Sequence, residues 1–436
     1  MIAPLAAVAL PAWLDPDRAF EAGFAQHPHA FWLDAGPGAA AGWSWVGSGR
    51  SEPDPEVVLG TDLTASSGPE DDTGPFRGGW VGWIGYDDAA ALAGAPTGPP
   101  DTRAPQALWL RADRFLAFNH ARRRVWAFAV PDDAAAFAAA ASEWIGEAPA
   151  STRSAPERGV ATARHLPGEY AGLIAECRSA IREGDAYQLC LTTRFSVSGD
   201  IDALATYRSL REITASHHGG YVRSAGVALV SATPERFLEV QGGVVRTHPI
   251  KGTRPRGADA DTDAALAEEL LESPKERAEN VMIVDLMRND LSRVCDPFSI
   301  AVDRLLEVES YPAVHQLVST VSGTLQPGTL LGELLDAAFP AGSMTGAPKL
   351  SAMTILHRLE RAPRGVFAGC FGWVGDDGAA DLAMIIRSIV VHPGGAYVGA
   401  GGGITWGSDA AAEVAEVGIK ARGPLRALGA ELPPGW

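Results

Sequence analysis

The sequence predicts a large protein of mixed α and β structure, and its length, composition and local patterns all point that way. The chain has 436 residues, more than one hydrophobic core normally supports, so we expect two domains or one large α/β assembly. Hydrophobic residues make up 46% and charged residues 20%, as in an ordinary globular protein. Strand-like and helix-like segments both recur along the chain.

The first 150 residues predict mainly strands and turns. A short apolar run without basic residues opens the chain, and we expect a first strand there rather than a signal peptide. Further strand and turn signals occur at 31–33, 43–47, 78–87, 108–118 and 124–130. The alanine-rich stretch 131–147 has strong helix propensity. Residues 149–162, rich in Ser, Arg, Pro and Gly, predict a linker between an N-terminal region over 1–150 and a second part over 163–432.

The second part predicts more helix. Tyr170, Ile174, Cys177 and Ile181 fall on one face of a helix that begins near Pro167 and stops at Gly184. Other helices are expected at 274–291, 329–338, 348–361 and 409–428. Strands are expected at 187–195, 227–232, 237–240, 243–247, 366–374, 382–392 and 397–399.

Charge and cysteine content narrow the function classes. The net charge of −17 argues against general binding to nucleic acid or to a membrane surface, because phosphate groups would be repelled. An anionic substrate would need a local cationic site or a bridging metal. Four cysteines without C-x-x-C spacing favour neither a zinc site nor a disulfide scaffold, so we expect a cytoplasmic protein. No stretch approaches the roughly 18 apolar residues of a membrane span.

Lys251 is the most informative residue. It lies in Pro-Ile-Lys-Gly-Thr-Arg-Pro-Arg-Gly, residues 249–257, where cationic side chains and turn-formers predict a tight turn directed at an anionic ligand. The alternative is a solvated basic loop.

Paired carboxylates occur on two predicted helices. Glu276 and Glu279 are three residues apart, and Glu413 and Glu416 repeat that spacing, with Lys420 four residues further on. Together the two helices could hold a hard divalent cation such as Mg²⁺, which takes oxygen ligands. The alternative is two solvated helix faces held by ion pairs.

Two glycine-containing segments predict anion-binding loops. Residues 399–404, Gly-Ala-Gly-Gly-Gly-Ile, would let backbone N–H groups approach an anion, although they do not form the dinucleotide-binding pattern. Residues 342–349 predict a polar turn that opens a helix. Either could also be an ordinary turn.

Together these segments resemble the chorismate-utilising enzymes, the family of anthranilate synthase component I, aminodeoxychorismate synthase component I, isochorismate synthase and salicylate synthase. The resemblance runs from about Pro167 to the C-terminus and is fainter before it, chiefly at 78–79 and 85–87. Its motifs lie at 187–195, 232–237, 249–253, 279–290, 339–349 and 399–404. The resemblance implies an α/β fold in which large antiparallel sheets pack as a sandwich with helices outside.

Two positions separate the subfamilies. Water-adding members carry a lysine where this chain has Gln188, and anthranilate synthases carry alanine where it has Lys251. The chain therefore most resembles the aminodeoxychorismate synthase component I branch. The open alternatives are anthranilate synthase component I, although its Leu-Leu-Glu-Ser feedback motif is not evident in the N-terminal region, and a catalytically silent homologue that only binds chorismate.

The resemblance also implies roles for individual residues. Lys251 would attack ring C2 of chorismate as a covalent nucleophile, and Glu235 would protonate the departing 4-hydroxyl. Mg²⁺ would be held by Glu279 and Glu416, with Glu276 and Glu413 in support. The further catalytic and substrate-binding candidates are His315, Thr345, Gln188, Thr253, Arg387, Gly401, Gly402, Gly403 and Lys420.

Some residues depart from the family pattern, and one partner is implied. Where the family often has a polar residue, this chain has Cys190; a frequent threonine is replaced by Ser388, and a frequent tyrosine by Trp373. These departures affect how the substrate is positioned, but not the class of reaction. No glutaminase sequence with a nucleophile-elbow cysteine is present. Ammonia is therefore expected from a separate glutamine amidotransferase subunit or from solution.

Overall fold

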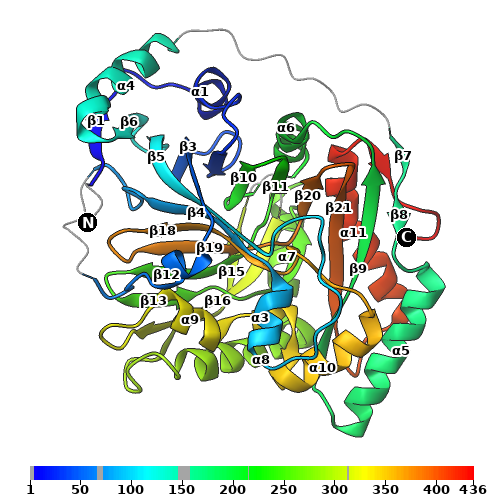
Figure 1. The fold of residues 1–436 in the computed structure, drawn as a ribbon. Coiled ribbons are helices and arrows are strands. Elements are labelled where there is room, and N and C mark those ends of the chain that lie inside the picture. Colours follow the sequence, from blue (N-terminus) through cyan, green and yellow to red (C-terminus); the bar gives the residue numbers. More distant parts are fainter. Residues whose placement is uncertain (1–3, 66–71, 146–157, 215, 312–313) are drawn as a thin grey trace.

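The computed structural model describes residues 4–65, 72–145, 158–214, 216–311 and 314–436. Strands gather in the middle of the molecule and helices surround them (Figure 1). Twenty of the described strands are joined by hydrogen bonds into one sheet, and their pairings are antiparallel. The expected fold class, α/β with large antiparallel sheets and helices outside, is confirmed.

The N-terminal strands and helix α4 agree with the sequence pattern, whereas three short helices were not predicted. In chain order they are β1 (Ala6–Ala9), α1 (Pro16–Gly23), β2 (Ala30–Asp34), β3 (Trp43–Glu52), α2 (Pro55–Leu59), β4 (Gly79–Ile84), α3 (Tyr86–Leu92), β5 (Ala107–Asn119), β6 (Arg124–Ala129) and α4 (Pro131–Glu143). The strand expected over 78–87 ends at Ile84, because helix α3 begins at Tyr86. Most of the linker expected over 149–162 lies outside the described residues.

The second part carries the remaining elements. They are β7 (Gly159–Val160), β8 (Thr162–Ala163), α5 (Pro167–Glu183), β9 (Gln188–Ser198), α6 (Ala203–Ile213), β10 (Gly219–Ser224), β11 (Val227–Ser231), β12 (Arg236–Gln241), β13 (Val244–Thr247), β14 (Ile250–Pro255), α7 (Ala260–Glu272), α8 (Pro274–Leu291), β15 (Ala301–Ser310), β16 (Val314–Thr324), α9 (Leu331–Ala338), the 3₁₀ turn η1 (Gly342–Met344), β17 (Gly346–Ala347), α10 (Lys349–Glu360), β18 (Cys370–Gly375), β19 (Ala380–Met384), β20 (Ser388–His392), β21 (Gly395–Ile404), α11 (Ala410–Ala427) and β22 (Ala430–Glu431).

Helix boundaries follow from local capping chemistry. Helix α8 begins at Pro274, which needs no N–H partner at a first position, and the Ser273 hydroxyl accepts from the Glu276 amide. Helix α5 ends where Gly184 adopts a left-handed φ of +88°. Three predictions of local structure are wrong: one strand, one turn (residues 249–257) and one loop (residues 399–404). The strand expected over 382–392 is broken at Arg387, which has a left-handed φ of +50°, while the lysine turn and the glycine loop both lie on strands, β14 and β21.

Strands from the two parts of the chain pair with each other. Strand β2 lies beside β10, and β4 lies beside β18. The predicted boundary between 150 and 163 is therefore crossed by the sheet, which continues on both sides of it.

Two clusters of buried hydrophobic side chains support this sheet. The first contains Trp83, Phe115, Phe237 and Phe371 and extends to helices α8 and α9. The second lies under α1, α4, α5 and α11. No helix in the described part of the chain has both the length and the apolar character that crossing a bilayer requires. All four cysteines are buried and unpaired.

Candidate active site

Lys251 lies at an irregular step of strand β14. The register of β14 against β16 shifts here, as in a β-bulge. The next residue, Gly252, has a φ of +86°, and a Cβ atom on it would come within 2.7 Å of Leu270 and 3.0 Å of Glu276. Glycine therefore lets β14 pack directly against α7 and α8, which brings Lys251 close to the carboxylates of α8. Within the described residues, no hydrogen bond or ion pair engages the Lys251 ammonium.

Glu235 lies just before β12 and close to Lys251. Burial raises the pKa of Glu235, and the Lys251 ammonium and a 3.2 Å hydrogen bond donated by Ser343 Oγ to Glu235 Oε1 lower it by less. A carboxylic acid with a raised pKa keeps its proton nearer to neutral pH and can deliver it to a leaving group. The structure thus brings two of the predicted catalytic residues into one region.

The predicted metal ligands come from helices α8 and α11. On α8, Glu276 Oε1 lies 3.6 Å from Arg254 Nη1. On α11, Glu416 Oε1 lies 2.7 Å from Lys420 Nζ, four residues on. Both carboxylates thus have a cationic side chain beside them. This agrees with the alternative stated above, in which the two helix faces are held by ion pairs.

Glu279 and Glu413 share one cationic neighbour. Lys275 Nζ lies 4.0 Å from Glu279 Oε1 and 3.9 Å from Glu413 Oε1, so it connects the two helices. In the described part of the chain, no three His, Cys, Asp or Glu side chains lie close enough together to hold a metal ion. Lys275 therefore links Glu279 with Glu413, and each of the four glutamates has one of the chain's own cations beside it.

The chemistry of these carboxylates nevertheless fits a hard divalent cation. Glu279 Oε1 is buried and accepts no hydrogen bond from any described residue. Burial raises the pKa of both Glu279 and Glu413, and neighbouring carboxylates act in the same direction. Carboxylate oxygens, one of them without a hydrogen-bond donor, are ligands that suit Mg²⁺. The magnesium assignment itself stays a prediction.

Gln188 and the glycine strand form another part of the site. Both polar atoms of the Gln188 amide are buried and lack a partner within the described residues. The amide lies against Gly403, where a Cβ atom would come within 2.7 Å of Gln188 Nε2. Gly401, Gly402 and Gly403 pair with β9 along one edge only, because β20 pairs with β21 no further than Val398. The glycines thus leave room for close approach, although they form a strand rather than a loop.

Two predicted cationic residues lie around this region. The Arg387 guanidinium makes no ion pair or hydrogen bond among the described residues; burial lowers its pKa, and the Glu416 carboxylate partly offsets that effect. Lys420 Nζ donates a 3.0 Å hydrogen bond to the Gly401 carbonyl. An unpaired, half-buried guanidinium suits an anionic ligand. Thr253, by contrast, is exposed, and its substrate-binding role stays a prediction.

His315 and Thr345 are engaged by the protein itself. His315 is buried, with Ser310 Oγ 2.8 Å from Nδ1 and Asp263 Oδ1 2.9 Å from Nε2. The Thr345 hydroxyl donates to the Ala341 carbonyl at 3.2 Å. These contacts describe structural roles, so the catalytic roles predicted for both residues rest on the resemblance alone.

A buried ion pair behind the site was not predicted from the sequence. Arg364 and Glu360 are joined by two hydrogen bonds of 2.7 and 2.9 Å. Arg364 also donates to the carbonyls of Met344 and Cys190, at 2.6 and 2.8 Å. It thereby fixes the segment that carries Ser343 and Thr345. The only sequence signal was the spacing of four residues between the two charges.

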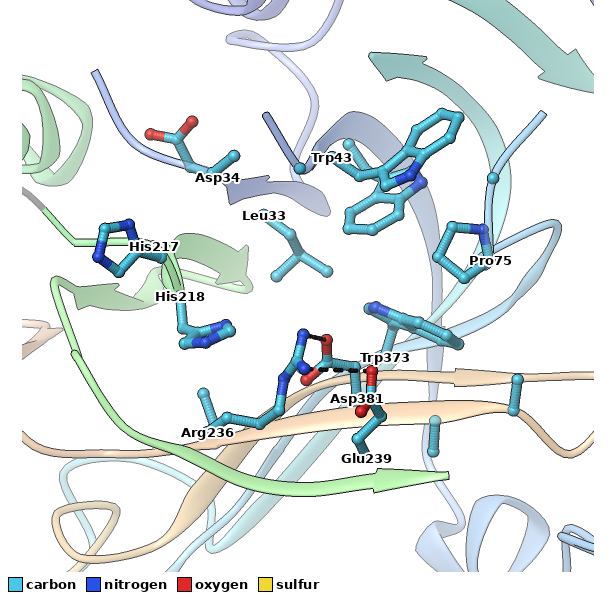
Figure 2. A pocket seen from close by; sticks show the side chains of 18 of the residues that line it. Leu33, Asp34, Trp43, Pro75, His217, His218, Arg236, Glu239, Trp373 and Asp381 are labelled. Atoms are coloured by element: carbon cyan, nitrogen blue, oxygen red, sulfur yellow. Dashed lines mark hydrogen bonds and ion pairs between the residues drawn. The ribbon is translucent and has the colours of Figure 1, made fainter. Parts of the chain in front are cut away.

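A separate cavity of about 540 Å³ lies between the N-terminal strands and the second part of the chain (Figure 2). Trp43, Pro75 and Trp373 line one side, and Arg236 pairs with Asp381 at 2.9 Å on another. None of the predicted site residues lines this cavity. The departure at Trp373 therefore concerns this cavity and not the surroundings of Lys251.

Comparison with known proteins supports the resemblance. The model of a family described as chorismate binding enzyme matches residues 47–426. The chain is 38% identical to an aminodeoxychorismate synthase of Streptomyces pristinaespiralis, over 95% of this chain and 64% of that protein. It is 37% identical to anthranilate synthase component 1 of Streptomyces coelicolor, over 91% of this chain and 83% of that protein. It is 38% identical to aminodeoxychorismate synthase component 1 of Klebsiella aerogenes, over 78% of this chain and 75% of that protein.

A solved structure agrees with these relatives. Anthranilate synthase component I of Streptococcus pneumoniae superposes with a TM-score of 0.75 at 28% identity, covering 97% of this chain and 92% of that one. The chain spans 64% of the length of two aminodeoxychorismate synthases that it matches, those of Streptomyces pristinaespiralis and Streptomyces griseus. The family model covers most of the chain, and several relatives exceed 30% identity over most of its length. This chain belongs to the chorismate binding enzyme family.

Proposed function

We propose that this protein aminates chorismate at C4 to give 4-amino-4-deoxychorismate, as component I of an aminodeoxychorismate synthase. The observation that carries the proposal is the proximity of Lys251, a cation without an ion-pair partner among the described residues, to Glu235, whose pKa burial raises. The names of the relatives from Streptomyces and Klebsiella support the same activity.

The first step would form a bond between the Lys251 amine and ring C2. Chorismate carries a 4-hydroxyl, which is a poor leaving group unless it is protonated. The Lys251 ammonium first gives up a proton to solvent; the resulting uncharged amine attacks C2, the ring double bonds shift, and the C4–O bond breaks. Glu235 gives its proton to the departing oxygen, which leaves as water.

The second step would release Lys251. Ammonia attacks C4, the double bonds shift back, and the C2–N bond to Lys251 breaks. The new C4 ammonium group then loses a proton, which restores the acid form of Glu235. The net reaction converts chorismate and ammonia to 4-amino-4-deoxychorismate and water.

The remaining residues would bind and orient the substrate. Mg²⁺, held by Glu279 and Glu416 with Glu276 and Glu413 nearby, would supply positive charge against the ring carboxylate. Arg387 would pair with a substrate carboxylate, since its guanidinium is otherwise unengaged among the described residues. The Gln188 amide would hydrogen-bond the substrate or the incoming ammonia, which would satisfy two buried polar atoms.

The source of ammonia and the location of the enzyme are parts of the same proposal. A relative is named component 1, which fits a second subunit, and we assign to that subunit the release of ammonia from glutamine. A cytoplasmic location is supported by four cysteines that are all unpaired.

Product analysis tests the proposal. Purified protein is incubated with chorismate, Mg²⁺ and an ammonium salt, and the products are separated by chromatography with fluorescence and mass detection. We expect a non-fluorescent 4-amino product. Fluorescent anthranilate would instead identify an anthranilate synthase, which is the name of the Streptomyces coelicolor relative. No amino product would identify a silent chorismate-binding homologue.

A second experiment tests the covalent step. Incubation with chorismate and Mg²⁺ without ammonia should leave a mass adduct on the peptide that contains Lys251. The Lys251→Ala variant should lose that adduct and the 4-amino product. An adduct that persists in the variant, or undiminished 4-amino product, would contradict the nucleophile assignment.

A further inference from the structure

Lys275 occupies the position between the two helices that carry the glutamates. It is the second residue of α8, and its ammonium lies 4.0 Å from Glu279 Oε1 and 3.9 Å from Glu413 Oε1. Glu279 is on the same helix and Glu413 is on α11, so one ammonium faces a carboxylate from each. The Glu279 and Glu413 side chains are only 13% and 5% exposed, whereas Lys275 is 56% exposed. The lysine therefore reaches from solvent toward two buried acids.

The lysine is held loosely. Ammonium–carboxylate hydrogen bonds are normally about 2.7–2.9 Å long, so contacts near 4 Å reflect charge attraction and not directed bonding. Glu279 Oε1 accepts no hydrogen bond within the described chain, although it is buried. Glu413 Oε1 already accepts a 2.7 Å hydrogen bond from Ser408 Oγ. An exposed side chain with such contacts can move into solvent at small cost.

A divalent cation would need the same space. Mg²⁺ binds oxygen ligands at about 2.0–2.1 Å, far shorter than the separations that surround the ammonium. Two positive centres between one pair of carboxylates would repel each other. Any cation bound jointly by α8 and α11 must therefore displace Lys275.

We infer that Lys275 is a tethered competitor of the divalent cation: its ammonium competes with the metal for Glu279, a ligand of the proposed site, and also faces Glu413 beside that site, so that metal binding moves the lysine out to solvent. This inference rests on the metal site of the proposed function. Its consequence is weak metal binding by the enzyme alone. Tight binding would require the additional oxygen ligands of a bound dicarboxylate substrate.

A merely structural role for Lys275 predicts the opposite result. If the lysine only held α8 against α11, its removal would loosen the two helices and weaken metal binding. If it competes with the metal, its removal strengthens binding. The sign of the change in affinity therefore separates the two roles.

The experiment measures Mn²⁺ binding to the full chain without chorismate, by electron paramagnetic resonance of the free ion, and Mg²⁺ binding by competition. In Lys275→Met we expect affinity to rise about tenfold, as for loss of one neighbouring positive charge at a partly exposed site. Lys275→Arg should stay near the wild-type value. Arg277→Met, which removes an exposed cation from the same helix, is the matched control for net charge and should change affinity by less than about twofold.

Unchanged or weaker binding in Lys275→Met would overturn the inference, as would an equal rise in Arg277→Met. A lack of Mn²⁺ binding by the wild type and by Lys275→Met would overturn the inference together with the metal site. Thermal unfolding of each variant shows whether it is folded. Because the readout is metal binding, the formation of anthranilate in the product assay would refute the proposed C4 amination without affecting this result.

Discussion

Replacing Arg364 with methionine would leave the Glu360 carboxylate buried without its main partner. The two side chains are 2% and 4% exposed, and Glu360 Oε1 also accepts from the amide and hydroxyl of Thr192, at 2.9 and 3.0 Å. Burial alone would lower the pKa of Arg364, but the Glu360 carboxylate holds it above its usual range. The guanidinium also lies 4.3 Å from the ring centre of Tyr86. All of these interactions would be lost together.

The expected loss of stability is about 3–5 kcal/mol, the usual cost of breaking a buried ion pair by removing one partner. That is a large share of the roughly 5–15 kcal/mol by which proteins are stable. The two carbonyl groups that Arg364 serves, of Met344 and Cys190, would add to the cost if water did not replace the guanidinium.

Urea unfolding, followed by tryptophan fluorescence, measures the effect. The double variant Arg364→Met with Glu360→Gln should recover part of the loss, because no charge is then left buried. Arg358→Met, on the exposed face of helix α10, which ends at Glu360, should change stability by less than about 0.5 kcal/mol. A loss below about 1 kcal/mol in Arg364→Met, or a double variant less stable than the single one, would refute the reasoning.

Three further predictions concern the site. Glu235→Gln should lower kcat by about 10²- to 10⁴-fold. Since burial raises the pKa of Glu235, wild-type activity should fall as pH rises through that pKa, and a pH–rate profile of the variant should lack this limb. Gly403→Ala should displace the Gln188 amide, because the new Cβ would lie 2.7 Å from Gln188 Nε2. Turnover should then fall, while the free energy of unfolding in urea changes little. Gly407→Ala is the control, since a Cβ atom there meets open space. Glu279→Gln should weaken Mn²⁺ binding and magnesium-dependent turnover in a folded protein; unchanged activity at limiting Mg²⁺ would contradict its role as a ligand.

The sequence predicted helices that have strong local signals better than it predicted the site geometry, and it missed helices α1, α2, α3, α6 and α7. Helix α8 could be placed from Pro274 to Leu291 because its cap, its first proline and its periodicity are local signals. The strand position of Lys251 could not, because it depends on how closely Gly252 approaches α7 and α8. Nothing in the local sequence describes that approach.

The glycine run shows the same limit from another side. Glycine is disfavoured in strands, so residues 399–404 indicated a loop. In the structure they continue β21, because glycine is what allows a strand to lie so close to Gln188, Thr192 and Glu413. The ion pair of Arg364 with Glu360 and the position of Lys275 likewise depend on contacts between distant segments.

The pairing of early strands with late ones has a consequence for the order in which the chain folds. Strand β4 can pair with β18 only after nearly three hundred further residues have been synthesised, and β2 can pair with β10 only after the intervening chain has been made. During synthesis, edges of the N-terminal strands remain unpaired until the partner segments leave the ribosome, and exposed strand edges favour association with other chains. Folding should therefore be slow and dependent on full-length chain, since long loops must close before these contacts stabilise the sheet. We expect the N-terminal strands to aggregate when they are expressed alone. Residues 163–432 expressed alone would lack β2 and β4, the neighbours of β10 and β18 in the sheet.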